Sequence, residues 1–132
     1  MSRRARLVLW APVALLLSYE FYLSSQSSLP SLTFGVEVQH FDKLEHFTYF
    51  FVMGALLVRA ARFGEGWTAR RTALLLVAAA SLYGSLDELH QSFVPGRDAE
   101  AGDVLADTLG ATAAAFLAEP LWRRLRLERV VN

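Results

Sequence analysis

Charge is distributed unevenly along this chain, and its sign alternates between the segments that separate four apolar runs. The runs cover about residues 7–23, 47–62, 72–94 and 104–122. Of the 13 basic residues, 11 precede the first run, flank the gap between the second and third, or follow the fourth. Most acids lie near the other two gaps. Because Arg-rich and Lys-rich loops stay on the cytoplasmic side of a membrane, this pattern predicts four membrane spans.

The predicted fold is therefore all-α, a four-helix transmembrane bundle in a single domain covering residues 1–132. An even number of spans places both ends of the chain on one side, and both ends are basic, so we expect both termini in the cytoplasm. The segments around 24–41 and 95–102 would then face outward. The expected spans are residues 7–24, 42–62, 71–94 and 103–122.

Composition constrains the function less than the charge pattern does. Apolar residues make up 54% of the chain and the mean hydropathy is +0.30, so composition alone does not establish a membrane protein. Glu20, His46 and Asp87 interrupt the runs, none of which reaches the ~18 uncharged apolar residues of an ordinary span. The chain has no cysteine, which excludes disulfides and thiolate ligands. Its net charge of zero gives no indication of nucleic-acid binding.

The first run also has the features of a signal peptide, with an Arg-rich start and an apolar middle. No small-x-small cleavage motif follows it, and Ser24-Ser25-Gln26-Ser27 is more typical of the polar end of a span. We therefore treat this run as the first span.

Three polar patches border the apolar runs, at residues 42–46, 85–97 and 103–107. Ionisable side chains are costly in such positions and are usually paired or functional. Asp87 and Gln91 are four residues apart, so they share a helix face. At 1.5 Å rise per residue, His46 and Asp107 each lie ~6 Å inside the start of their helices. The patches therefore meet at one depth and predict a polar, outward-open pocket beneath Arg97. The expected lining residues are Glu20, Lys43, His46, Asp87, Glu88, Gln91, Asp103 and Asp107.

So many carboxylates need compensating cations, and Lys43 and Arg97 supply only part of the charge. A divalent cation such as Mg²⁺, Ca²⁺ or Zn²⁺ would supply the rest, since carboxylates and imidazole are suitable ligands. The candidate metal ligands are His46, Asp87, Glu88 and Asp107. In an enzyme, His46 would be the general base, with Asp87 and Glu88 as ligands or acid. The candidate ligand-binding residues are Glu20, Asp42, Lys43, Gln91, Arg97, Asp103 and Asp107, with Arg97 suited to a phosphate or carboxylate.

Each patch also has a purely structural interpretation. Asp42 and Asp103 would serve as helix caps, and His46 would form an interhelical hydrogen bond. Arg97 and the adjacent Asp98 would form a solvated turn. Small residues such as Gly54, Gly84 and Gly110 are interpreted as helix-packing positions.

Four motifs in this order resemble the VanZ-like family of small bacterial membrane proteins. The motifs are Phe21-Tyr22-Leu23-Ser24-Ser25-Gln26, Asp42-Lys43-x-x-His46-Phe47, Asp87-Glu88-x-x-Gln91-x-Phe93-x-Pro95-Gly96-Arg97 and Asp103-Val104-Leu105-Ala106-x-Thr108-x-Gly110. One departure is Asp107, where the family pattern usually has Asn; the extra charge favours a cation there.

The resemblance implies a multi-pass protein of the bacterial plasma membrane, with the lipid bilayer as its first partner. The family is named for a protein linked to teicoplanin resistance, which implies a phenotype rather than a mechanism. Three hypotheses follow: a module that binds a lipid-linked envelope component or the lipoglycopeptide, a metal-assisted hydrolase or transferase acting on such a substrate, or a structural polar network. The Gly-lined helix faces also permit a homo-oligomer.

Overall fold

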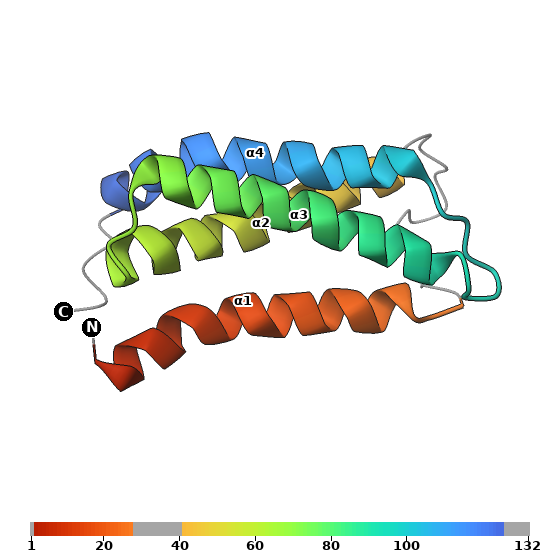
Figure 1. Cartoon of the computed structure of the whole chain (residues 1–132), viewed down its shortest axis with the longest axis horizontal. Coiled ribbons are helices and arrows are strands. Elements are labelled where there is room, and N and C mark those ends of the chain that lie inside the picture. The colour runs from red at the N-terminus through yellow and green to blue at the C-terminus, as the bar shows by residue number, and fades with distance from the viewer. Residues whose placement is uncertain (1, 28–40, 126–132) are drawn as a thin grey trace.

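The computed structural model describes residues 2–27 and 41–125, and these ranges form four helices without any strand. The helices are α1 (Arg3–Ser24), α2 (Phe41–Arg59), α3 (Ala69–Gln91) and α4 (Ala101–Arg124), and a π-helical turn, η1 (Ala60–Gly64), continues α2 (Figure 1). All four are long and apolar enough to cross a membrane. The all-α four-helix prediction is therefore confirmed, although α3 ends at Gln91, three residues before the predicted end of the third span.

The four helices run alternately up and down the bundle. The start of α1, the α2–α3 connection and the end of α4 lie at one end, and the α3–α4 connection lies at the other (Figure 1). We call the first the basic end and the second the acidic end, after the residues that the sequence places there. The side of the membrane that each end faces stays a prediction. Residues 28–40 of the expected outward loop, and the basic Arg126 and Arg129, lie outside the described residues.

Small residues let α2 and α4 pack closely. A Cβ atom at Gly110 would collide with the carbonyl oxygen of Phe47, and one at Gly54 would lie 2.8 Å from the Cβ of Ala114. The side chain of Phe50 on α2 and that of Leu76 on α3 fill the adjoining core and are each 1% exposed. The predicted role of small residues in packing is thus confirmed for this pair of helices.

Helix α1 lies at the periphery of the bundle (Figure 1). Only 17% of an apolar 18-residue stretch of α1 is buried, compared with 33–39% of the corresponding stretches in the other three helices. Two tyrosine hydroxyls hold it, because Tyr49 donates to the carbonyl oxygen of Leu16 and Tyr83 donates to that of Leu17. Since few contacts hold α1, its side nearest α2 is the natural place for a cleft.

Paired charges close the basic end of the bundle. Arg62 donates two hydrogen bonds to Glu119, at 2.6 and 2.9 Å, and a third to the carbonyl oxygen of Trp67. Glu65, just beyond the second span, accepts two hydrogen bonds from Arg6, at 2.8 and 3.1 Å. These hydrogen bonds from the guanidinium lower the pKa of Glu65 below its usual value. Ion pairs therefore join α1 to η1 and η1 to α4.

Candidate functional site

A histidine–aspartate pair joins α2 to α4 near the acidic end. His46 Nδ1 lies 2.9 Å from Asp107 Oδ1, and the Asp107 side chain is only 2% exposed. Gly84 on α3 makes room for this carboxylate, because a Cβ atom there would lie 2.6 Å from Asp107 Oδ2. Asp107 thus occupies the junction of three helices and orients the imidazole ring.

Lys43 neutralises a second group of carboxylates at the start of α4. Its Nζ lies 3.0 Å from Asp42 Oδ2, 2.6 Å from Glu100 Oε2 and 3.0 Å from Asp103 Oδ1. The interpretation of Asp103 as a helix cap is wrong. The cap position of α4 is Glu100, and Asp103 lies in the first helical turn, where its carboxylate faces Lys43 instead of the backbone.

A chain of hydrogen bonds runs along the end of α3. Gln91 donates to Asp87 Oδ2 at 2.7 Å, and its carbonyl oxygen accepts from Arg97 Nε and Nη2 at 3.3 and 3.2 Å. Within the described ranges, Arg97 forms no ion pair, and Asp87 Oδ1 is buried without a hydrogen-bond partner. The predicted i, i+4 pair is therefore formed, and Gln91 links it to the Arg97 guanidinium.

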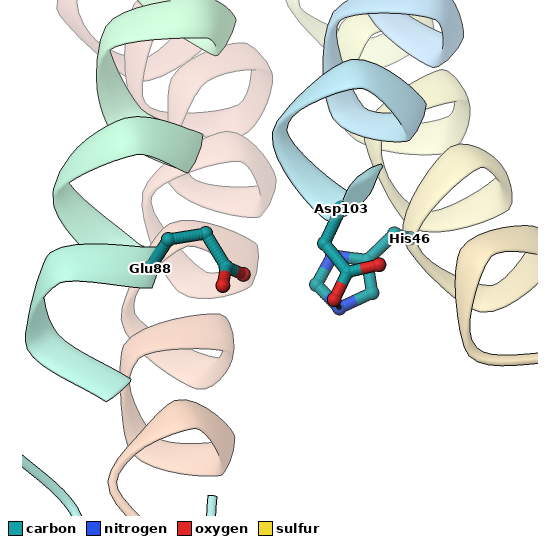
Figure 2. A group of neighbouring side chains, drawn as sticks. All are labelled: His46, Glu88 and Asp103. Atoms are coloured by element: carbon teal, nitrogen blue, oxygen red, sulfur yellow. Dashed lines mark ion pairs between the residues drawn. The ribbon is translucent and has the colours of Figure 1, made fainter. Parts of the chain in front are cut away.

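Glu88 is the second buried carboxylate of α3, with 7% of the residue exposed. Its Oε2 accepts a hydrogen bond from the backbone N–H of Glu100 at 2.6 Å, whereas its Oε1 is buried and unpaired among the described residues. The side chain points toward His46 and Asp103 (Figure 2). Ligand atoms of these three residues, one from each of three helices, lie within 4.8 Å of one another.

One described cleft takes in only part of the predicted polar set. A cleft of about 750 Å³ opens beside α1 and α2, and only three of the residues expected around the pocket, Glu20, His46 and Arg97, line it. The others are at least partly enclosed between α2, α3 and α4, or lie at the start of α4, through the contacts given above. His46 belongs to both regions, so the cleft and the buried cluster share one side chain.

Most of the cleft wall is apolar. Its remaining lining residues are Leu16, Tyr19, Leu23, Ser24, Phe41, Leu44, Glu45, Thr48, Tyr49 and Val52. Three of these residues, Tyr19, Leu44 and Val52, are exposed, so the wall is accessible. The cleft thus combines the ionisable side chains of Glu20, His46 and Arg97 with a wall that is apolar over most of its area.

Sequence reasoning missed two features of this end. Ser25 Oγ lies 3.1 Å from His90 Nε2, so His90 contacts the end of α1. Ser24 is 1% exposed, and its hydroxyl has no hydrogen-bond partner within the described chain. The Ser24-Ser25 pair at the end of the first run was the available signal, but it was interpreted only as the polar end of a span.

The fold and the site define a class of protein: a multi-pass membrane protein whose acidic end encloses carboxylates from several helices beside a lateral cleft. Within that class, the chain belongs to the VanZ/LLP1 family, whose model matches residues 3–123. The resemblance inferred from the four motifs is thereby confirmed. No curated protein matched the chain, and neither did any solved structure.

Proposed function

We propose that this protein is a binding module of the bacterial plasma membrane, which holds a lipid-linked component of the cell envelope at its acidic end. The positive-inside rule orients that end outward and puts both termini in the cytoplasm. The observation that supports the function best is the cleft beside α1, because its wall includes both ionisable side chains and a larger apolar part. An amphiphile has the same division between headgroup and chain.

The polar part of the cleft favours an anionic headgroup. Arg97 forms no ion pair within the described ranges, and a guanidinium binds a phosphate or carboxylate through two parallel hydrogen bonds. Gln91 holds this guanidinium from behind. An uncharged chain would lie against the apolar side chains of Leu16 and Val52.

The size of the cleft selects between the two candidate ligands. A volume of about 750 Å³ is that of a site for a drug-sized molecule. It holds a headgroup and the first part of a lipid chain, whereas a whole lipoglycopeptide is much larger and would insert only its acyl chain. We therefore favour a lipid-linked envelope component, and any effect on teicoplanin susceptibility would arise through that component.

A metal-assisted hydrolase or transferase is the second candidate. The arrangement of His46, Glu88 and Asp103 supports it, because an imidazole and two carboxylates are a suitable ligand set for a catalytic metal. The chain contains neither a His-Glu-x-x-His nor a Gly-x-Ser-x-Gly signature, so binding is the simpler proposal.

Binding is tested with a long-chain lipid phosphate and with the uncharged alcohol of the same chain. Each is titrated into protein in mild detergent, and the bound fraction is measured by native mass spectrometry. We expect Arg97→Gln to weaken binding of the phosphate by about 10–100-fold, since it removes a charge-assisted hydrogen bond, and to leave the alcohol unaffected. Val52→Trp should weaken both, because it fills the apolar part of the cleft.

The matched control is Arg70→Gln, which removes an exposed guanidinium at the basic end. Equal binding of the phosphate by the Arg97→Gln and Arg70→Gln variants would contradict the proposed site. Conversion of the lipid phosphate and water into the alcohol and inorganic phosphate, in the presence of Zn²⁺, would replace the binding proposal with the hydrolase.

A further inference from the structure

Three side chains of the acidic end are each anchored by one atom, and each has a ligand atom close to those of the other two. His46 is anchored through Nδ1 by Asp107, at 2.9 Å. Asp103 is anchored through Oδ1 by Lys43, at 3.0 Å, and Glu88 through Oε2 by the backbone N–H of Glu100, at 2.6 Å. Groups outside a metal site hold its ligands in this way, by fixing their orientation without occupying their inward atoms.

His46 and Asp103 face each other at a distance too long for a hydrogen bond. His46 Nε2 lies 4.0 Å from Asp103 Oδ2, and the ligand atoms of the three residues fall within 4.8 Å (Figure 2). Tetrahedral Zn²⁺ with bonds of 2.0–2.2 Å separates its ligand atoms by roughly 3.3 Å. A contraction of about an ångström around an ion would therefore complete the geometry.

Glu88 gives an independent reason to place a cation here. The residue is only 7% exposed, and its Oε1 is buried with no hydrogen-bond partner in the described part of the chain. A buried, unpaired carboxylate oxygen is costly. An ion pair between a charged His46 and its two aspartates would account for His46 and Asp103, but it would leave Glu88 Oε1 unpaired. A cation accounts for all three residues.

We propose that His46, Glu88 and Asp103 bind one divalent transition-metal ion, with Zn²⁺ as the best match. The imidazole favours Zn²⁺ over Mg²⁺ or Ca²⁺, and the two carboxylates balance its charge. Asp107 acts as the positioning residue for His46 and is not itself a ligand. Compared with the ligand set expected from sequence, Asp103 replaces Asp87 and Asp107.

The ion would also make the neighbouring cleft more favourable for an anion. Three protein ligands leave one position of a tetrahedral ion open, and His46 lines the cleft. A phosphate oxygen in that position would lie between the metal and the cleft region that includes Arg97. The metal site does not depend on the amphiphile site, because the three ligands are anchored by the protein alone.

The test is a Zn²⁺ titration of the full chain, carrying no histidine tag, after chelator treatment in mild detergent. Calorimetry and elemental analysis should give one Zn²⁺ per chain. Glu88→Gln and Asp103→Asn should each lower the affinity at least about tenfold, because each removes a ligand. Asp107→Asn should lower it less, since its amide oxygen can still accept from His46 Nδ1.

Two controls locate the ion. Glu45→Gln removes an exposed carboxylate next to His46 in the sequence. Glu100→Gln removes a carboxylate from the group that Lys43 neutralises. Neither substitution should change the number of Zn²⁺ ions bound per chain. Absence of stoichiometric Zn²⁺ in the wild type would overturn the proposal, as would equal affinity in the Glu88→Gln variant. Co²⁺ absorption spectra of the wild type test the site without any substitution, because an N/O-coordinated site gives intense d–d bands only at low coordination number.

The same samples keep this proposal separate from the proposed function. Zn²⁺ binding without retention of a lipid phosphate would leave the metal site standing and remove the amphiphile site. Retention of the lipid phosphate without Zn²⁺ binding would leave the amphiphile site standing and remove the metal site.

Discussion

The two ends of the bundle differ in how completely their carboxylates are paired. At the basic end, Glu65 and Glu119 are both held by arginines, through two hydrogen bonds from Arg6 and two from Arg62. At the acidic end, Asp87 and Glu88 each keep a buried oxygen without a partner among the described residues. Unsatisfied buried polar groups cost stability and are rare in native proteins. The difference fits the proposal that the acidic end binds a ligand, since functional sites often keep groups that cost stability.

The tryptophans follow the same division. Trp10 donates to Glu65 at 3.2 Å, Trp122 donates to the carbonyl oxygen of Ala55 at 2.8 Å, and the Arg71 guanidinium lies 4.3 Å from the Trp67 ring centroid. All three tryptophans of the chain thus contribute to the basic end. Their fluorescence reports on that end, while ligand or metal binding reports on the other, so the two can be measured separately.

The largest expected effect comes from Gly110→Leu. A side chain there would collide with the backbone of α2 at Phe47, which cannot move aside as a flexible side chain can. We expect α2 and α4 to separate at the acidic end, at a cost of about 3 kcal/mol or more in the free energy of unfolding. Thermal unfolding in detergent, followed by circular dichroism, measures this loss.

Ala79→Leu is the matched control, because it adds similar bulk at an exposed position of α3. An equal loss of stability in both variants would show that bulk alone, rather than the close approach of α2 and α4, is responsible.

Next in size is Glu119→Gln at the basic end. The substitution removes the carboxylate that accepts from both Arg62 and Arg123. We expect a loss of about 1–2 kcal/mol in the free energy of unfolding, since partly buried hydrogen bonds between charged groups are broken. Tryptophan fluorescence should report unfolding at a lower temperature. Unchanged stability would contradict the view that this end is stabilised by its ion pairs.

The sequence predicted the number of helices, their order and the residues of the acidic end, because charge alternation and i, i+4 spacing are local signals. It could not predict which of these side chains would lie close enough together to bind the same ion. Asp103 was interpreted as a cap from its position, but the chain enters α4 three residues earlier, so its carboxylate turns toward Lys43. The anchoring of Glu88 by a backbone N–H twelve residues away depends on the course of the α3–α4 connection, for which the sequence carries no periodic signal.

At the acidic end, replacing a glutamate with glutamine should raise the free energy of unfolding or leave it unchanged, whereas at the basic end it should lower it. Glu88→Gln keeps an oxygen to accept from the Glu100 N–H and places an amide, which can donate to Asp103, where the unpaired oxygen was. In the presence of chelator we expect no loss of stability and a gain of up to about 1 kcal/mol. Added Zn²⁺ should then stabilise the wild type more than the variant. A loss like that of Glu119→Gln would remove the contrast between the two ends.

The smallest effect is expected from Glu65, at the edge of the basic end. Because hydrogen bonds from Arg6 lower its pKa below the usual value of 4.5, its contribution to stability is complete above that value and is lost as the pH falls through the lowered pKa. Glu65→Gln should therefore differ from the wild type at pH 6, and the two should converge once the pH is below the lowered pKa of Glu65. The pair is exposed and screened by salt, so the difference in Tm at pH 6 should be only about 1–2 °C. The fluorescence of Trp10 and Trp67, whose ring centroids lie 6.3 Å apart, should change over the same pH range in the wild type alone. A difference between the two proteins that does not change as the pH falls would mean that Glu65 holds α1 through its shape and its hydrogen bond from Trp10, and that its charge contributes little.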